Sequence, residues 1–290
     1  MRNAKIVGFV NQKGGVGKST LTMLVATALA KAPYNLKVAI VDCDAQTSLQ
    51  DQRKMDEFRL TRKLSAAKAE EHLKKTKNGE GYSDEELQKT IATFTPIIRE
   101  KIAEDYSLAF PYPLIYADVN EKEQVIRTII ELKGTGKYDL IFVDMPGSAS
   151  EKGIGTILSV ISHAFVPVES GNFDVTSTNK FIVKTLKNIK FVKENEYNSP
   201  FNITVLFNKL EETNKYKDVI DGFYGKYEGD QDINIIDEEY GLPRSVFYKD
   251  NGNTYESLLQ VKARTKTNKK MQERFKDLLK EIMKELELKK

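Results

Sequence analysis

Residues 13–20 read KGGVGKST and combine glycines, two lysines and two hydroxyl side chains in one short segment. Glycine leaves room for backbone N–H groups to turn inward, and such groups bind the oxygens of a phosphate. An apolar run at residues 5–10 precedes the segment, and a helical apolar pattern follows it. A strand, a glycine loop and a helix in this order predict a phosphate-binding loop, because the helix adds the positive end of its dipole. The residues expected to surround the phosphates are Gly14, Gly15, Val16, Gly17, Lys18, Ser19 and Thr20.

The loop departs from the usual pattern G-x-x-x-x-G-K-[ST], because Gln12 stands where that pattern has its first glycine. Lys18 is placed to serve the β- and γ-phosphates from inside the loop. Lys13 is therefore surplus to the binding of one nucleotide, and we interpret it as acting on a nucleotide held by another subunit. The alternative is a solvated lysine beside a glycine turn, which leaves the match of the whole segment unexplained.

Aspartates follow two further apolar runs. Asp42 and Asp44 lie two residues apart at the end of VAIVDCD, and Asp144 ends the run LIFVD. Mg²⁺ prefers oxygen ligands, often one protein hydroxyl together with phosphate oxygens and waters. We therefore expect Ser19 to bind the metal directly and Asp144 to hold it through water. Each aspartate alone could instead cap a helix, and this alternative applies most to Asp44.

The segment MPGS directly after Asp144 has the composition of a switch loop. Pro146 fixes the turn, and Gly147 lets a backbone N–H approach a γ-phosphate. Loss of that phosphate would free the loop, so the segment is predicted to change with the bound nucleotide. A plain strand-to-helix turn is the alternative.

Together these motifs resemble those of the ParA/MinD class of P-loop ATPases, whose deviant Walker A loop carries the extra lysine. The resemblance covers about residues 3–51 and 114–244. It implies ATP and Mg²⁺ as ligands and a homodimer in which Lys13 reaches the partner's nucleotide. It also implies that Lys13, Lys18 and Asp44 are catalytic, with Asp44 orienting the hydrolytic water. Asp42 would support the metal shell.

The same resemblance bears on recognition of the base. Asn208, in NKLE, matches the asparagine that relatives use on adenine, and Pro243, in LPRSV, matches a turn that closes over the base. NKLE is also one residue type away from the NKxD motif of GTPases, and Glu211 could accept hydrogen bonds from guanine. The preference for ATP therefore rests on the family. Arg244 lies where relatives often carry basic residues for DNA.

Apolar runs alternate with helical patterns along most of the chain. The runs lie at residues 38–44, 113–119, 138–147, 163–168 and 202–208, with helical stretches at 121–133, 155–161 and 175–193. This alternation predicts a doubly wound, mainly parallel α/β sheet covered on both faces, with ligands beyond the carboxyl ends of the strands. With the resemblance, it indicates a P-loop NTPase of the SIMIBI class over residues 1–290.

Residues 51–110 interrupt this alternation and contain no convincing strand. They are predicted to form a helical insertion of two or three helices around a turn at residues 77–81. Ser83 and Glu86 have the spacing of a capping box for a helix that begins at Asp84. A solvated elaboration and a docking or dimer-facing subdomain both remain open, and most relatives would have a shorter link.

The basic character of the chain is concentrated at its C-terminus. Residues 261–290 hold 11 Lys/Arg and 5 Asp/Glu, although the whole chain has a net charge of only +3. A basic amphipathic helix is predicted over 262–290, and we expect its apolar face to pack on the body of the protein. That face comprises Met271, Phe275, Leu278, Leu279, Ile282 and Leu286. A nucleic-acid role is assigned to Arg264, Lys266, Lys269 and Lys270. Besides packing on the body and nucleic-acid binding, a third alternative is a helix that lies on a membrane surface. The acidic residues of this segment argue against binding to anionic lipids.

Composition excludes several other classes. One cysteine, Cys43, excludes a disulfide framework and a tetracysteine metal site within one chain. Neither a run of about 18 apolar residues nor a basic and apolar leader pattern is present. We expect a cytoplasmic, nucleoid-associated protein without stable membrane association.

The hypothesis is a ParA-like, Mg-ATP-dependent dimerising ATPase that binds nonspecific DNA. It would act with a ParB-like or other adaptor in partition or positioning of plasmid or mobile-element DNA, including conjugative elements. Hydrolysis would be slow until a partner and DNA complete the site. A MinD-like positioning ATPase at a membrane and a metabolic P-loop ATPase are the alternatives.

Overall fold

A sheet of eight strands forms the centre of the computed structural model, which describes residues 3–44, 48–77, 80–146, 151–169, 172–211 and 214–288. The order is β3-β2-β4-β1-β5-β6-β7, and β8 pairs with β6. All pairings between described strands are parallel, so the predicted doubly wound, mainly parallel sheet is confirmed. The strands are β1 Lys5–Phe9, β2 Val38–Asp42, β3 Leu114–Tyr116, β4 Leu140–Asp144, β5 His163–Val168, β6 Asn202–Leu210, β7 Ile233–Ile235 and β8 Leu242–Pro243.

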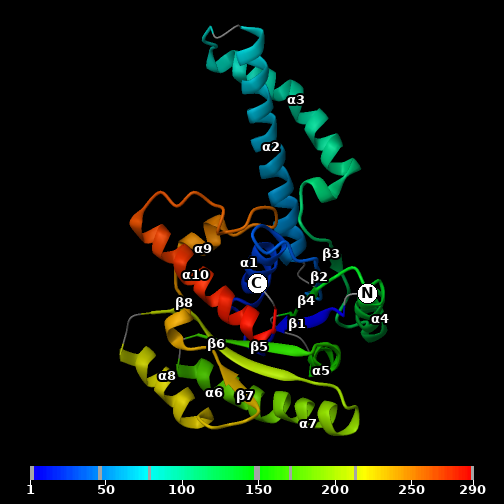
Figure 1. Cartoon of the computed structure of the whole chain (residues 1–290), viewed down its shortest axis with the longest axis vertical. Coiled ribbons are helices and arrows are strands. Elements are labelled where there is room, and N and C mark those ends of the chain that lie inside the picture. The colour runs from blue at the N-terminus through cyan, green and yellow to red at the C-terminus, as the bar shows by residue number, and fades with distance from the viewer. Residues whose placement is uncertain are drawn as a thin grey trace.

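Helices cover both faces of this sheet (Figure 1). They are α1 Lys18–Ala30, α2 Ser48–Thr76, α3 Asp84–Glu104, α4 Lys122–Gly134, α5 Glu151–Val160, α6 Asn172–Phe181, α7 Lys187–Glu196, α8 Asn214–Tyr227, α9 Val246–Asn251 and α10 Lys266–Glu285. One core cluster packs α1, α9 and α10 on one face, and the other packs α4 to α8 on the opposite face. In β2, Val38 and Ile40 belong to the first cluster while Ala39 and Val41 belong to the second. This burial on both faces is why the strands read as continuous apolar runs.

The observed elements differ from the predicted ones in several places. The C-terminal helix predicted over 262–290 is shorter and spans Lys266–Glu285, because the Thr265 hydroxyl caps its start by accepting the N–H of Asn268. The stretch predicted as helix over 175–193 runs from Asn172 to Glu196, with a π-helical segment at Ile182–Leu186 between α6 and α7. Strands β7 and β8 were not predicted, because they have three and two residues and are too short to show a period of two.

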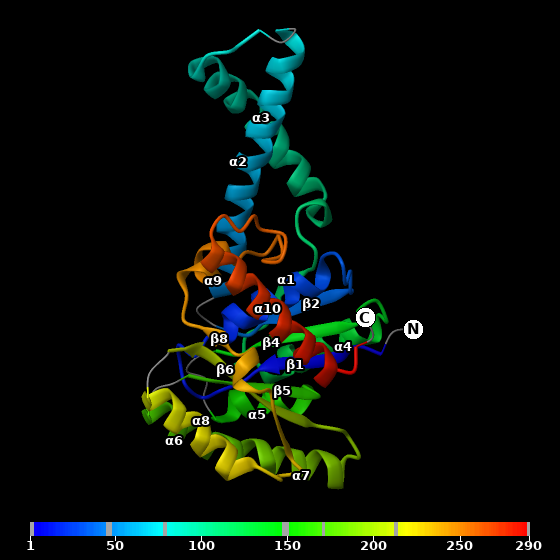
Figure 2. The same ribbon diagram turned by 60° about the vertical axis from the view of Figure 1, so that its left-hand side comes forward.

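Helices α2 and α3 form an antiparallel pair that projects away from the sheet, which we call the arm (Figures 1 and 2). Its first helix begins at Ser48, slightly before the predicted insertion. The predicted capping box is present: Glu86 N–H donates to the Ser83 hydroxyl at 3.2 Å, and Ser83 N–H donates to the Glu86 carboxylate at 2.8 Å. In α3 only Ile102 is buried. The position of the arm therefore depends on its base rather than on a large core of its own.

Helix α10 packs into the same core cluster as α1 and crosses the body of the protein (Figure 1). The six apolar residues predicted for its inner face are at most 9% exposed. The expectation that this face packs on the body is therefore confirmed. Among the described residues, none of the helices combines the length and apolar content that a bilayer-spanning segment requires.

Truncation of Phe275 tests this packing. Its ring is 0% exposed, so Phe275→Ala should lower the free energy of unfolding by about 3–5 kcal/mol through lost burial and a residual cavity. Urea denaturation measures the change. The neighbouring, exposed Lys276→Ala is the control and should stay within about 0.5 kcal/mol of the wild type. A loss below 1 kcal/mol for Phe275→Ala would contradict the packing of α10 in the core.

Candidate functional site

The phosphate loop leaves the sheet near its centre, since β1 lies between β4 and β5. Gly15 and Gly17 have φ of 80° and 96°, a left-handed conformation that glycine adopts without the Cβ penalty of other residues. Gly17 is also the N-cap of α1, and no side chain caps this helix. The first backbone N–H groups of α1 therefore face the region beyond the strand ends, where an anion is stabilised by them and by the helix dipole.

Asn11 holds the loop from behind. This side chain is 0% exposed, and its amide nitrogen donates to the Pro167 carbonyl at 3.0 Å and to the Thr178 hydroxyl at 2.9 Å. Its Oδ1 accepts the N–H of Lys13 at 3.0 Å. One buried amide thus joins the start of the loop to β5 and α6, which fixes the path of the backbone.

Lys18 is buried within the loop, and its Nζ donates to the Lys13 carbonyl at 2.9 Å. Burial lowers the pKa of Lys18, while the negative charges of Asp144 and Asp44 oppose that change. Burial makes the charged form of a lysine less stable, and a nearby anion offsets this cost. The buried ammonium of Lys18 therefore favours the binding of an anion.

Asp42 and Asp144 lie side by side, because the register pairs them at the carboxyl ends of β2 and β4. Both are 0% exposed. Asp42 Oδ1 accepts the N–H of Asp44 at 3.1 Å, and Asp144 Oδ1 accepts the Thr22 hydroxyl at 3.4 Å. Ser19 also hydrogen-bonds to Asp144. Within the described part of the chain, the Oδ2 atoms of both aspartates have no hydrogen-bond partner.

The electrostatics of this pair fit a divalent cation. Burial, with a smaller contribution from neighbouring carboxylates, raises the pKa of Asp42 to about 6 and that of Asp144 to about 7. A bound cation relieves this repulsion and occupies the free oxygens. The described residues contain no cluster of three or more His, Cys, Asp or Glu side chains that could cage a metal. A site with few protein ligands is suitable for Mg²⁺, because this ion usually keeps several bound waters and also binds phosphate oxygens of the substrate.

Two adjoining cavities lie at this edge of the sheet. One has a volume of about 530 Å³ and is lined by Lys18, Ser19 and Asp44 among others. The second, of about 390 Å³, has mainly apolar walls. Gly17, Thr20 and Lys209 line both, so the two cavities are neighbours. The walls of the second are contributed by Leu21, Leu24, Leu242, Pro243, Val246 and Tyr248 together with Asn208 and Arg244. A cavity with charged and hydroxyl side chains in its walls lies beside a mainly apolar one, which matches the two halves of a nucleotide.

Asn208 packs directly against the loop. Its Nδ2 donates to the Val16 carbonyl at 2.8 Å, and a Cβ placed on Gly17 would lie 2.4 Å from that nitrogen. Asn208 is 7% exposed and lines the apolar cavity. The residue predicted to recognise the base therefore also shapes the loop, and Gly17 is required by space as well as by its φ.

A network of charged residues borders the site. Lys209 has φ of 55°, and its Nζ donates to the Gly15 carbonyl and lies 3.7 Å from Glu169. Arg244 pairs with Glu169 at 2.6 Å and with Glu211 at 2.8 Å. Glu211 thus has a cationic partner and is not among the residues that line the apolar cavity.

Those remaining predicted site residues that the structure describes are not among the residues that line the two cavities. Pro146 is buried and lines neither cavity, while Gly147 lies outside the described residues. The tail cations Arg264, Lys266, Lys269 and Lys270 are exposed and also line neither cavity. The assignment of DNA binding to these four residues and to Arg244 stays a prediction.

Three residues of the site were missed by the sequence interpretation. Asn11 had a usable signal, since a polar residue directly after an apolar strand and before a glycine loop is placed to hold that loop. Thr22 and Glu169 had none, because a hydroxyl in a helix and an acid after a strand are common on solvated surfaces. Their partners in space are distant in sequence.

Comparison with known proteins places this arrangement in a family. A family model described as an AAA domain (AAA_31) matches residues 4–203. No curated protein gives a significant match. Among solved structures, a Cyanothece McdA variant in complex with ATP is 15% identical with a TM-score of 0.60, covering 100% of this chain and 99% of that one.

Two further structures are similar. A putative plasmid partition protein from Borrelia burgdorferi bound to AMPPNP is 17% identical, with a TM-score of 0.53 and coverage of 98% of this chain and 100% of that one. The MinD cell division protein of Aquifex aeolicus is 19% identical, with a TM-score of 0.54 and coverage of 97% and 98%. At identities of 15–19%, the similarity to these structures shows a shared fold. The predicted resemblance to ParA/MinD-type P-loop ATPases is therefore confirmed for the fold.

Alanine at Gly17 tests the geometry of the loop. Gly17→Ala should destabilise the protein by about 1–2 kcal/mol from its left-handed backbone alone, and more because its Cβ meets Asn208. Gly15→Ala is the control, since it shares the positive φ but has no atom within 4 Å of the added Cβ. Urea denaturation compares the two.

The double variant Gly17→Ala/Asn208→Ala separates the two contributions, because it removes the side chain that the new methyl group meets. It should recover part of the loss relative to the sum of the single variants. Equal losses for Gly15→Ala and Gly17→Ala, with no recovery in the double variant, would contradict the close contact.

Proposed function

The chain belongs to the AAA-domain family whose model it matches, and from that membership we propose that it is a Mg-ATP-dependent dimerising ATPase of the ParA/MinD kind. One observation carries the proposal. A phosphate loop with lysines at both of its ends lies beside the carboxyl ends of β2 and β4, where Asp42 and Asp144 are buried and paired, and Asp44 lines the same cavity as Lys18 and Ser19. A protein that only binds a nucleotide does not require a carboxylate to orient water. The position of Asp44 in the wall of the same cavity therefore favours an ATPase over a simple binding module.

In the proposed mechanism, the backbone N–H groups of the loop and of α1 bind the phosphates, and Lys18 neutralises their charge. Ser19, with Asp42 and Asp144 behind it, would hold Mg²⁺, which would supply neutralisation of the phosphate charge. Asp44 orients the attacking water. Lys13 extends to the nucleotide of a second copy, so that the complete site exists only in the dimer.

The base is proposed to be adenine. The second cavity offers apolar walls with Asn208 as the amide beside them, and a purine ring packs on such walls. Glu211, the residue that would distinguish guanine, pairs with Arg244 instead. The solved structures of the McdA variant and the Borrelia protein contain ATP and AMPPNP, which supports the same nucleotide here.

The proposed role is partition or positioning of plasmid or mobile-element DNA, with a ParB-like or other adaptor and with nucleoid association. Support comes from the exposed cations at the start of α10 and from the Borrelia relative, which is described as a putative plasmid partition protein. Arg244 is a weaker DNA candidate because two carboxylates neutralise it. The burial of the inner face of α10 counts against a membrane-binding C-terminal helix.

Two lysine variants test the site and the dimer separately. Lys18→Ala should abolish nucleotide binding and hydrolysis, because Lys18 is buried within the loop. Lys13→Ala should retain binding of a fluorescent ATP analogue and lose nucleotide-dependent dimerisation, measured by light scattering with AMPPNP and Mg²⁺. Hydrolysis by Lys18→Ala at the wild-type rate would overturn the site, whereas unchanged dimerisation of Lys13→Ala would overturn only the role of that lysine.

A triple substitution tests DNA binding. Lys266, Lys269 and Lys270 changed to alanine should weaken binding to nonspecific duplex DNA at least tenfold, and should reduce the slope of log affinity against log salt by up to about 3. Lys68, Lys74 and Lys75 on α2 changed to alanine provide a control with the same loss of charge on another exposed surface. Equal effects of both triple variants would show that net charge alone, rather than the start of α10, governs the interaction.

A further inference from the structure

A third cavity lies at the base of the arm, away from the phosphate loop. Its volume is about 590 Å³, and its walls come from four aromatic side chains, Tyr106, Phe110, Tyr112 and Tyr138, with Arg53 beside them. The lining residue Pro113 directly precedes β3 and Tyr138 lies two residues before β4, so this cavity lies toward the amino ends of the strands. The phosphate loop lies at their carboxyl ends. The cavity is therefore not part of the nucleotide site.

Arg53 is an unusual residue for this position. It is 4% exposed, and its guanidinium carbon lies 4.3 Å from the ring centroid of Phe110 and 4.9 Å from that of Tyr112. Its Nη1 donates to the Tyr112 carbonyl at 3.3 Å. Nε and Nη2 are buried and have no hydrogen-bond partner in the described part of the chain. A buried arginine is normally paired, since an uncompensated charge away from water is strongly unfavourable.

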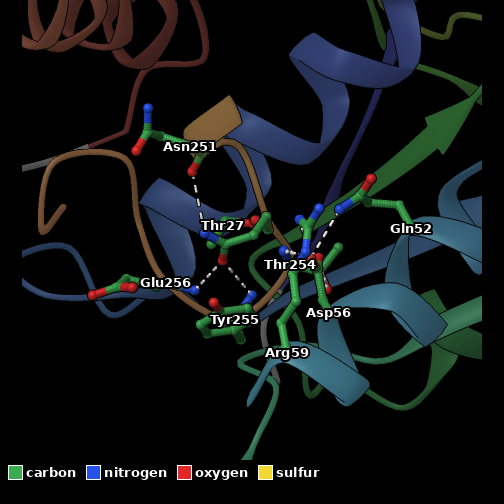
Figure 3. Close-up of polar contacts among 9 residues, drawn as sticks. Thr27, Gln52, Asp56, Arg59, Asn251, Thr254, Tyr255 and Glu256 are labelled. Atoms are coloured by element: carbon green, nitrogen blue, oxygen red, sulfur yellow. Dashed lines mark hydrogen bonds and ion pairs between the residues drawn. The ribbon is translucent and has the colours of Figure 1, made fainter. Parts of the chain in front are cut away.

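The carboxylates about one helical turn further along α2 supply little of this compensation, because Asp56 has only a small favourable charge effect on Arg53. Asp56 is 0% exposed and accepts from Thr254 N at 2.8 Å, Thr254 Oγ1 at 3.0 Å and Gln52 Nε2 at 2.8 Å (Figure 3). It also lies 3.5 Å from Arg59. Glu57 accepts the hydroxyl of Tyr106. Both acids have other partners, and neither makes an ion pair or a hydrogen bond with Arg53 in the described structure.

We propose that this cavity binds a small organic anion, whose carboxylate or phosphate pairs with Arg53 and whose flat apolar part lies against the aromatic walls. The guanidinium has planar N–H donors, which suit a carboxylate or phosphate with two oxygens, and binding requires the side chains that cover Nε and Nη2 to shift. Its stacking on Phe110 and Tyr112 holds it in one orientation, so little freedom is lost on binding. The volume is in the range of small-molecule sites.

The site would act on the junction between the arm and the ATPase core. Tyr112 Oη lies 2.9 Å from Thr27 Oγ1 on α1, and Thr27 Oγ1 donates to the Asn253 carbonyl at 3.0 Å. Helix α1 begins at the phosphate loop. An anion that fixes Arg53 and Tyr112 would therefore stiffen the base of the arm at the point where it meets that helix.

Binding of benzoate and phenyl phosphate tests the proposal, with uncharged benzamide as the matched probe. Titration calorimetry and thermal melting are carried out on the full chain and on Lys18→Ala, so that binding at the phosphate loop is recognised separately. Both anions should bind saturably to both proteins and raise the melting temperature, and benzamide should bind at least tenfold more weakly. This result does not depend on whether the protein hydrolyses ATP.

Arg53→Met should weaken binding of both anions at least tenfold, since it keeps much of the volume and removes the charge. Without an anion it should melt no lower than the wild type, because an unpaired buried charge has been removed. Arg62→Met, an exposed arginine on the same helix, is the control and should bind normally. Ser107→Trp, at an exposed lining position, should block the cavity without changing Arg53 and gives a second test if Arg53→Met does not fold.

Three outcomes would overturn the proposal. They are the absence of saturable binding by either anion, equal affinity for benzamide and benzoate, and unchanged affinity in the folded Arg53 and Ser107 variants.

Discussion

The parallel register of β4 between β2 and β1 is the constraint on which the site depends. It pairs Asp42 with Asp144 and places both at the strand ends, next to the point where the phosphate loop leaves β1. Adjacent strands are about 4.8 Å apart, so two carboxylates in this register repel each other in a buried setting. Burial is the main cause of the raised pKa of each carboxyl, and the negative charge of Asp42 adds to the effect on Asp144. A shift of one residue would turn one of them to the opposite face and separate the two carboxylates of the proposed metal site.

The phosphate loop is held from two sides. Asn11 joins its start to β5 and α6, and Asn208 joins its middle to the end of β6. The resemblance treats the second of these residues as a contact for the base alone. In this chain the same side chain also shapes the loop, so the proposed recognition of the base and the conformation of the loop depend on one residue.

The arm is joined to the core by polar contacts at its base. Asp56 accepts hydrogen bonds from Thr254 in the segment between α9 and α10 (Figure 3), and the Thr27 hydroxyl donates to the carbonyl of the neighbouring Asn253. These buried hydrogen bonds connect α1, α2 and the segment before α10. The interpretation of residues 51–110 as a solvated elaboration therefore fits the exposed outer part of the arm, and it does not fit the base, where the buried Arg53 and an aromatic cavity lie.

The sequence by itself determined the loop, the aspartates at the strand ends, the parallel α/β class, the capping box at Ser83 and the buried face of α10. Each of these depends on residue types at short, fixed spacing, which follow from the geometry of a single strand, turn or helix. Only the tertiary structure decided the order of the strands, the partners of Asn11, the ion pairs of Arg244 and the burial of Arg53. These depend on contacts between residues that are far apart in the chain, such as Arg244 and Glu169. An arginine or a glutamate has the same appearance in a sequence whether it is solvated or paired, because its environment is created by other segments.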